Sequence, residues 1–225
     1  MVKTRTYCIR CGECCIQSSP TLQAEDLPLV KEGTVPRQNL YAIRKGELVW
    51  DNVAEALLVA REEMVKIRER EGGSCLYYDH DQRGCRIYGA RPAQCSAMAC
   101  WDPGRFMEVY KKPKLAREDV LENPVLVGLV RAHESKCSYD TMGKHVKRIE
   151  KAGDEAVEAI IQMLRFDHSL RPHISRKLGL DPKEMDFLFG RPMIDTVRMF
   201  GLKVERTPDG GFYLTALPPR SDGKA

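Results

Sequence analysis

The sequence contains no run of about 18 apolar residues, the length that a transmembrane helix requires, so we expect no membrane-spanning segment. Its start, MVKTRTYC, lacks the apolar core of a signal peptide, and we therefore expect a cytoplasmic protein. There is also no large excess of one charge. The net charge is +4, and acidic residues are interspersed with the basic ones. This distribution argues against nucleic acid as the partner.

Short catalytic motifs are absent as well. The sequence has no HExxH pair, no Gly-x-Gly-x-x-Gly loop, no phosphate-binding loop and no nucleophile elbow. It also lacks the C-x3-C-x2-C order of radical S-adenosylmethionine enzymes. No side chain can therefore be named as catalytic, and the choice between an enzyme and an accessory subunit stays open.

Cysteine, by contrast, is abundant, with nine residues in a chain of 225. Thiols remain reduced in the cytosol, where a dense group of them indicates metal or cluster binding. Eight of the nine fall within the first 100 residues. These eight candidate ligands are Cys8, Cys11, Cys14, Cys15, Cys75, Cys85, Cys95 and Cys100. The ninth, Cys137, is isolated, and we expect a buried, inert thiol there.

The segment YCIRCGECCI places four cysteines within eight positions. Cys8, Cys11 and Cys14 form C-x2-C-x2-C, the opening of a bacterial ferredoxin motif, and need a fourth ligand from elsewhere in the chain. Cys15 follows directly, and adjacent side chains on a trans peptide are expected to point in different directions. The Cys14–Cys15 pair could therefore serve two centres, bind different irons of one cluster, or include one idle thiol. A vicinal disulfide between them would be strained and easily reduced.

The second group of cysteines has the spacing C-x9-C-x9-C-x4-C, from Cys75 to Cys100. A zinc ribbon would show a second tight C-x2-C here, so the spacing disfavours a simple ribbon but not zinc as such. The run CLYYDHDQRGCRIY predicts a β-hairpin. If 75–78 pairs with 85–88, Cys85 lies opposite Tyr78 and Cys75 opposite Tyr88. The two thiols then lie on opposite faces, which favours two centres, although a slip of one residue would reverse this conclusion.

Some polar residues near the cysteines have two interpretations. Asp79-His80-Asp81 could serve acid–base or metal chemistry, but the polar tip of the hairpin is the favoured interpretation. Arg86 and Arg91, with Lys3 or Arg5, could tune a bound cluster through their charge.

The predicted fold class is α+β, mostly helical, with a small cysteine-ligated domain that contains the short hairpin. We expect a short helix over 24–30, capped by Thr21, and an amphipathic helix over 53–71 that stops at Gly72-Gly73. A short helical or looped piece should follow Arg91-Pro92. The run KKPKLARED at 111–119 is predicted to be an exposed connector.

The last third of the chain predicts helices over 141–165, 169–178 and 182–200, with breaks at Gly179 and near Gly190-Arg191-Pro192. A final hairpin is expected around Asp209-Gly210-Gly211. These elements suggest a cysteine-cluster domain at 1–110, a connector with short helices at 111–140 and a helical region at 141–225. The helical region could be winged-helix-like, but a helical cap on the cysteine domain is favoured, because fold analogy is weak support.

The motif order resembles a known family. CIRCGECC, then a cysteine before an aromatic hairpin, then GCRIYGARPAQC and a last cysteine are similar to the YkgJ-type CxxCxxCC cysteine-cluster proteins, described as zinc- or iron-chelating. The resemblance covers about residues 7–101. The family includes a domain of the flagellin lysine methylase, where an iron–sulfur cluster is implicated. The resemblance implies that all eight cysteines are ligands and that Arg91-Pro92 is the structural turn before Cys95.

Thiolate-only ligand sets suit both iron–sulfur clusters and zinc. The ferredoxin-like triad and the missing ribbon pattern favour one or two iron–sulfur clusters, with [4Fe–4S] preferred and zinc as the alternative. The favoured function is a redox, electron-transfer or cluster-dependent accessory protein whose C-terminal region binds a protein partner. One alternative is an iron–sulfur-dependent modifying enzyme, for which the resemblance implies protein-lysine methylation. The other is a zinc-stapled protein- or DNA-interaction module.

Overall fold

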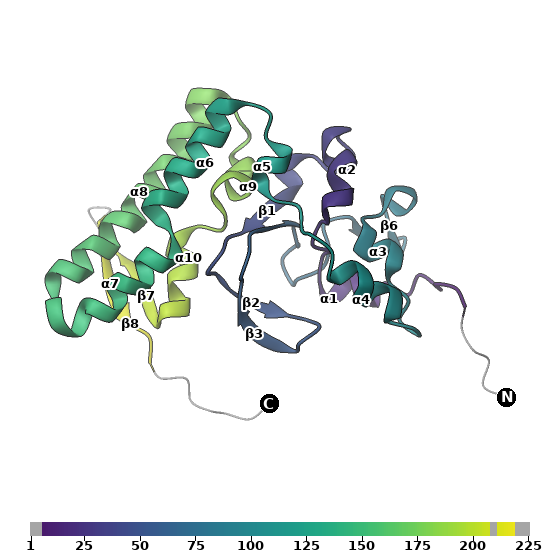
Figure 1. Cartoon of the computed structure of the whole chain (residues 1–225), viewed down its shortest axis with the longest axis horizontal. Helices are drawn as coiled ribbons and strands as arrows, with labels where there is room; N and C mark the ends of the chain where they lie inside the picture. The colour runs from purple at the N-terminus through teal and green to yellow at the C-terminus, as the bar shows by residue number, and fades with distance from the viewer. Residues whose placement is uncertain (1–5, 208–210, 219–225) are drawn as a thin grey trace. The chain divides into compact units, whose positions relative to one another are not determined.

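The computed structural model describes residues 6–207 and 211–218. The fold is α+β and mostly helical, as the sequence predicts (Figure 1). In the described residues, the strands form two-stranded sheets in which β1 pairs with β4, β2 with β3, β5 with β6 and β7 with β8. The backbone divides into two compact units. Unit 1 comprises Met1–Ala42 and Glu63–Asn123, and unit 2 comprises Ile43–Glu62 and Pro124–Ala225. The boundaries predicted at 110 and 140 stay a prediction.

Unit 1 is built from short helices, 3-10 turns and short strands. In chain order these are α1 (Glu13–Gln17), η1 (Ala24–Asp26), α2 (Leu27–Lys31), η2 (Arg37–Asn39), β1 (Leu40–Ile43), β4 (Met64–Ile67), β5 (Tyr78–Asp79), β6 (Gly84–Cys85), η3 (Tyr88–Ala90), α3 (Ala93–Ala97), α4 (Gly104–Tyr110) and α5 (Arg117–Val120). The helix expected over 24–30 forms as η1 and α2, but Thr21 does not cap it. The backbone N–H of Gln23 donates instead to the carboxylate of Asp26, at 2.8 Å.

Three distant segments meet in the core of unit 1. The N–H of Leu22 donates to the carbonyl of Val65 at 2.9 Å, that of Val65 to Leu115 at 2.9 Å, and that of Leu115 to Leu22 at 3.0 Å. All three side chains are fully buried. Leu115 belongs to the run predicted to be an exposed connector, and this prediction is wrong for Leu115 and Arg117. The Arg117 guanidinium is buried and pairs with Glu63.

The helix predicted over 53–71 is wrong. This segment contains β3 (Ala56–Val59), which pairs with β2 (Leu48–Asp51), and then β4, which pairs with β1. The apolar spacing fits a helix locally. However, β-strand preference depends on the partners that a segment meets, and here those partners lie in the preceding residues. The burial of β4 accordingly alternates, with Val65 and Ile67 buried.

Unit 2 is dominated by long helices. After β2 and β3 its elements are α6 (Pro124–Cys137), α7 (Tyr139–Ala152), α8 (Asp154–Leu178), η4 (Pro182–Glu184), α9 (Met185–Phe189), α10 (Met193–Thr196), η5 (Val197–Phe200), β7 (Leu202–Arg206) and β8 (Phe212–Ala216). The helix predicted over 141–165 is wrong as a single element, because Gly153 adopts φ 49° and ψ −122° and separates α7 from α8. The predicted breaks at Gly179 and near Gly190 are confirmed.

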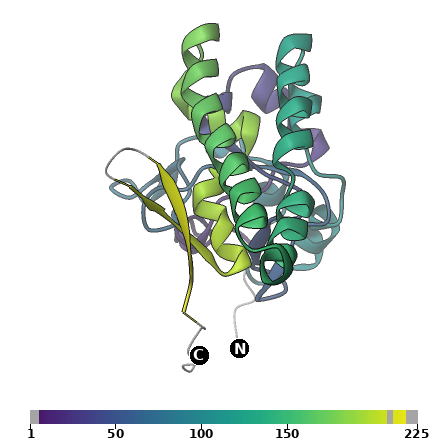
Figure 2. The same ribbon diagram turned by 90° about the vertical axis from the view of Figure 1, so that its left-hand side faces the viewer.

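The terminal hairpin is confirmed, with Arg206 opposite Phe212 and Leu202 opposite Ala216. Asp209 and Gly210 of the predicted turn lie outside the described residues. The hairpin packs on the helices through Phe212, whose buried ring joins a cluster with Met142 of α7 and Leu164 of α8. Figures 1 and 2 both show α7 and α8 lying side by side, with the yellow hairpin against them.

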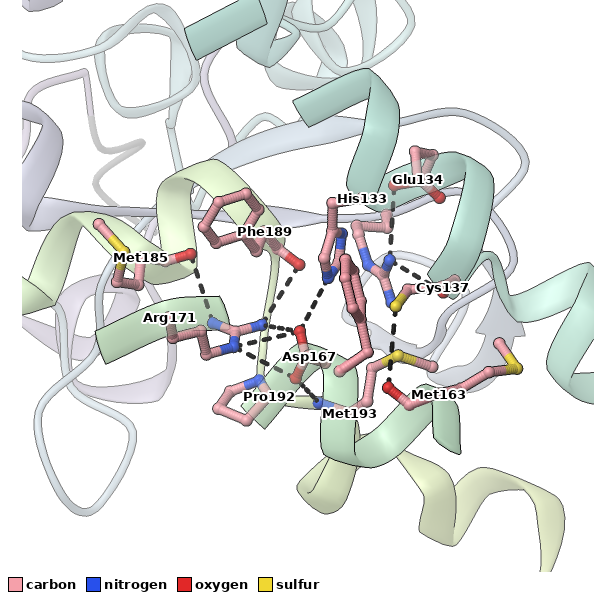
Figure 3. Close-up of polar contacts among 12 residues, drawn as sticks. His133, Glu134, Cys137, Met163, Asp167, Arg171, Met185, Phe189, Pro192 and Met193 are labelled. Atoms are coloured by element: carbon pink, nitrogen blue, oxygen red, sulfur yellow. Dashed lines mark hydrogen bonds and ion pairs between the residues drawn. The ribbon is translucent and has the colours of Figure 1, made fainter. Parts of the chain in front are cut away.

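A buried polar network also lies inside unit 2 (Figure 3). The carboxylate of Asp167 on α8 contacts the imidazole Nε2 of His133 on α6 at 2.8 Å and the guanidinium of Arg171 at 2.9 Å. It also accepts the backbone N–H of Met193 at 3.0 Å. This network was not predicted from the sequence. The signal was an Asp-x3-Arg pair inside the apolar pattern of α8.

No helix among the described residues is both long and apolar enough to cross a membrane.

Candidate metal centre

Five of the eight predicted ligands form one neighbourhood in unit 1. The thiol of Cys95 interacts electrostatically with those of Cys75, Cys14 and Cys85, and the thiol of Cys15 with those of Cys95 and Cys75. We call Cys14, Cys15, Cys75, Cys85 and Cys95 the thiol group. Its members come from α1, from the chain just before β5, from β6 and from α3. The structure thus combines the two cysteine-rich segments that are some 60 residues apart in the sequence.

Gly12 places the first segment. Its carbonyl accepts the N–H groups of Cys15 and Ile16 at 2.8 and 2.9 Å, which starts α1. Gly12 has φ 86°, and an added Cβ would lie 2.2 Å from the Tyr78 hydroxyl oxygen. Only glycine permits both this backbone conformation and this approach to the β5 side chain. The glycine of CGECC therefore brings Cys14 and Cys15 to the hairpin.

Backbone contacts hold Cys75 beside the first segment. The N–H of Cys75 donates to the carbonyl of Cys15 at 2.7 Å. The predicted hairpin is confirmed, and so is its register at Cys85, which pairs with Tyr78. The strands are only two residues long, however, and Tyr88 belongs to η3. The described strands therefore do not include the pairing of Cys75 with Tyr88 on which the opposite-face expectation rested, and the thiols of Cys75 and Cys85 interact electrostatically.

Two hydrogen bonds to residues at the start of unit 1 anchor α3, which carries Cys95. Asp26 accepts the N–H of Ala93 at 2.8 Å, and Gln94 accepts the N–H of Thr21 at 3.0 Å. Asp26 is buried, and this burial raises its pKa although two backbone N–H groups favour the carboxylate. The turn predicted at Arg91-Pro92 is present, because Pro92 directly precedes the first turn of α3. Both anchors fix the position from which Cys95 faces the other thiols.

Cys14 and Cys15 do not diverge as the sequence suggested. Their sulfur atoms lie 3.9 Å apart, because both residues sit in the single turn of α1 with their side chains rotated toward each other. Tetrahedral zinc with Zn–S bonds of about 2.3 Å places its sulfur ligands about 3.8 Å apart. The prediction of diverging side chains is therefore wrong, and this sulfur–sulfur distance fits two ligands of one ion.

The thiols strongly influence one another's ionisation. The hydrogen bond with Cys15 lowers the pKa of Cys14 to about 6, and the same bond raises the pKa of Cys15. Burial raises the pKa of Cys95, as does the charge of neighbouring thiolates, while Arg91 acts in the opposite direction. Burial also raises the pKa of Cys75. If several of these thiols were ionised together, the thiolates would repel each other, and a bound cation would offset that repulsion.

The remaining predicted ligands, Cys8, Cys11 and Cys100, are exposed. Among the residues that the structure describes, no three Cys, His, Asp or Glu side chains converge closely enough to hold one ion as they stand. The triad of Cys8, Cys11 and Cys14 therefore does not close on a common point. The assignment of all eight cysteines as ligands stays a prediction.

The polar residues near the cysteines have defined partners. Asp79 forms the polar tip that was expected, since its carboxylate accepts the N–H groups of Asp81 and Gln82 at 3.0 Å each. Arg86 pairs with Asp79 at 3.2 Å, so its charge is partly compensated there. Arg91 interacts with the thiols of Cys14 and Cys95. Lys3 and Arg5 lie outside the described residues.

Cys137 is fully buried in unit 2, as expected. Burial raises its pKa to about 12, and its sulfur lies 3.8 Å from the carbonyl of Met163. A protonated thiol of this kind is a poor ligand and a poor nucleophile.

The donor chemistry of the thiol group fits a thiolate-binding metal or cluster. Thiolates are soft ligands that select zinc or iron–sulfur clusters, whereas calcium and magnesium require oxygen donors. Residues Cys14, Cys75, Cys85 and Cys95 would supply four thiolates, with Cys15 as a fifth donor beside Cys14.

One of the comparisons with known proteins, the match to a family model, agrees with this chemistry. Neither the curated proteins nor the solved structures contain a significant match to the chain. A family model matches residues 7–120, which is about half of the chain and extends beyond the resemblance noted at 7–101. The chain therefore belongs to the CxxCxxCC family, described as a putative zinc- or iron-chelating domain.

Proposed function

We propose that this protein binds an iron–sulfur cluster, with [4Fe–4S] favoured, through the thiol group, and that it acts as a redox or cluster-dependent accessory protein. The observation that carries this proposal is the gathering of five thiols from separate segments of unit 1. Support for a cluster comes from the ferredoxin-like C-x2-C-x2-C opening and from eight cysteines in total, enough for two sets of four ligands.

The chain's own residues have distinct roles in this proposal. Cys14, whose pKa is about 6, would supply a thiolate at neutral pH. Asp26 and Gln94 hold α3 so that Cys95 faces the other thiols. Arg91 adds positive charge next to the thiolates, which stabilises their ionised form. A bound cluster would store and transfer single electrons.

The C-terminal helices are the part that we propose for partner binding. The family match ends at residue 120, and none of the eight predicted ligands lies beyond residue 100. Residues 124–218 are therefore not required as ligands. The helices and hairpin of unit 2 are therefore available for contact with a protein that donates or accepts electrons.

Zinc is the second candidate, and one observation favours it. The 3.9 Å between the sulfurs of Cys14 and Cys15 matches two ligands of a single tetrahedral ion. Each thiolate ligand of a [4Fe–4S] cluster binds its own iron, so in a cluster only one of these two cysteines would be a ligand at a given corner. A zinc site would make the protein a stapled interaction module without redox chemistry.

Anaerobic purification followed by iron, acid-labile sulfide and zinc analysis tests the proposal. We expect iron and sulfide in equal amounts, brown protein, and an electron paramagnetic resonance signal after reduction. Zinc at one ion per chain without sulfide would reject the cluster and support the zinc alternative. A Cys75→Ser, Cys95→Ser variant should lose the metal, while Cys137→Ser should retain it.

A further inference from the structure

Two arginines from different segments of unit 1 contact the same aromatic ring. The guanidinium carbon of Arg10 lies 4.2 Å from the centroid of the Tyr88 ring, and that of Arg91 lies 3.8 Å from it. Arg10 lies between Cys8 and Cys11, and Tyr88 lies between Cys85 and Cys95. A cation over an aromatic face within about 6 Å is attracted by the ring quadrupole. We call this arrangement the Arg10–Tyr88–Arg91 stack.

The backbone of Arg10 is strained in a way that serves this contact. Arg10 has φ 56°, in the left-handed region that non-glycine residues rarely adopt. Such strain persists only where surrounding contacts over-determine it. The contacts here are the stack on Tyr88 and the bond from the Arg10 N–H to the Cys8 sulfur at 3.4 Å. The left-handed residue therefore turns the loop so that its side chain reaches the ring.

Arg91 connects the stack to the thiol group. Its charge interacts with the thiols of Cys14 and Cys95, so it faces both cysteine-rich segments. The Arg91 Nε is buried and has no hydrogen-bond partner, and the guanidinium carbon lies over the Tyr88 ring. A planar guanidinium can stack on an aromatic face, whereas an ammonium group cannot do so in the same way.

From these contacts, and resting on the proposed function, we infer that the Arg10–Tyr88–Arg91 stack is a positioning device for the metal centre. It holds the C-x2-C-x2-C segment against the segment that carries Cys85 and Cys95, so that thiols from both can bind one centre. Arg10, Tyr88 and Arg91 are positioning residues and not ligands.

Hydrogen exchange on the reduced, metal-free full-length chain tests the docking without requiring any metal. We expect Tyr88→Leu and Arg10→Gln to increase amide exchange in residues 7–17 about tenfold, which corresponds to ~1.4 kcal/mol. Tyr88→Phe keeps the ring and should exchange like the wild type. The matched control is Arg83→Gln, an exposed arginine in the turn between β5 and β6 that should also leave exchange in 7–17 unchanged.

Loss of the bound metal to a chelator is the second readout. We expect Tyr88→Leu to lose metal about tenfold faster than the wild type, in the range that changes outside the ligand set produce, and Tyr88→Phe to match the wild type. Arg91→Lys should lie between them, because it keeps the charge but not the planar contact.

The two readouts separate this inference from the proposed function. Equal exchange in residues 7–17 of the wild type and Tyr88→Leu would overturn the stack as a docking device, whatever the metal content. Equal rates of metal loss in a wild type that binds metal would overturn its role toward the centre. The third outcome is that Tyr88→Leu exchanges faster than the wild type in residues 7–17 while the wild type binds neither iron nor zinc. This result would support the docking and reject the proposed function.

Discussion

Substitution of Gly12 by alanine tests how the two cysteine-rich segments are brought together. The Cβ of alanine would lie 2.2 Å from the hydroxyl oxygen of Tyr78 and 2.6 Å from its Cζ. The Tyr78 side chain is 3% exposed, so it has little room to move away. Gly12→Ala must therefore either strain the hairpin or release the N-terminal segment from it.

The magnitude follows from two contributions. A left-handed conformation costs a non-glycine residue about 1–2 kcal/mol. Overpacking against a buried ring adds about 1–3 kcal/mol. The sum, ~2–5 kcal/mol, is an upper bound on the destabilisation by Gly12→Ala. The reason is that the N-terminal segment detaches once the strain exceeds the free energy that docks it.

Gly33→Ala is the matched control for Gly12→Ala. Gly33 has φ 79°, close to that of Gly12, but nothing lies within 4 Å of the position that an alanine methyl group would occupy there. It therefore carries only the backbone cost of about 1–2 kcal/mol. The difference between the two variants isolates the contact with Tyr78.

Hydrogen exchange of the metal-free chain across a urea series would measure both effects, with β4 reporting the unfolding of unit 1 and residues 7–17 reporting docking. We expect Gly12→Ala to expose 7–17 to exchange and Gly33→Ala to leave that segment protected. Adding Tyr78→Leu to Gly12→Ala should restore part of the protection by removing the ring atoms. If Gly12→Ala and Gly33→Ala behave alike in 7–17, the close approach to Tyr78 does not exist and the reasoning fails.

Three further predictions concern other contacts. Burial lowers the pKa of His133, with the Asp167 hydrogen bond only partly offsetting it, so the unfolded chain binds a proton below pH about 6.5 that folded unit 2 does not. The urea midpoint of unit 2 should therefore fall between pH 7.5 and 5.5, and His133→Asn should reduce that fall. Asp26→Asn turns an amide N–H donor toward the backbone N–H of either Gln23 or Ala93. This change should lower the unfolding free energy of unit 1 by about 1–3 kcal/mol and accelerate amide exchange in α3. Gly190→Ala brings a methyl group to 2.8 Å from the Arg44 side chain at φ 72°, and should lower the unfolding free energy of unit 2 by about 2 kcal/mol or more.

Each of these has a result that would contradict it. A pH slope that is identical in the wild type and His133→Asn would show that this histidine is not buried in its neutral form. Unchanged exchange in α3 of Asp26→Asn would mean that the carboxylate does not anchor Ala93. Gly179→Ala is the control for Gly190→Ala, since Gly179 has φ 64° and open space at the position of an added methyl group. An equal loss of unfolding free energy in the two variants would show that the methyl group at position 190 does not clash with Arg44.

Local signals were sufficient for several elements. The hairpin that contains Cys85 formed with the predicted register at Tyr78, and the breaks at Gly179 and Gly190 are present. In each case the cause is a property of a few adjacent residues, such as turn chemistry or the left-handed freedom of glycine. The family could also be recognised from motif order alone, and the family model agrees.

The segment 53–71 shows where local reasoning failed. Its apolar residues recur with a spacing that suits a helix, and alanine, leucine and glutamate favour one. It nevertheless forms strands, because β2 and β1 supply pairing partners that no pattern inside the segment reveals. The network of His133, Asp167 and Arg171 was missed for the same reason, since α6 and α8 must pack before the groups meet.

The sequence by itself determined that this is a metal-chelating protein of the CxxCxxCC family, because dense reduced thiols in a fixed order have few other uses. Only the tertiary structure decided which thiols are neighbours. Cys14 and Cys15 meet Cys75, Cys85 and Cys95 because Gly12 approaches Tyr78, Cys75 bonds to the backbone of Cys15, and Asp26 anchors α3. The hydrogen bonds that Cys15 and Asp26 accept, from Cys75 and Ala93, join residues that are far apart in the sequence. Such contacts depend on the folded path of the chain and leave no local pattern in the sequence.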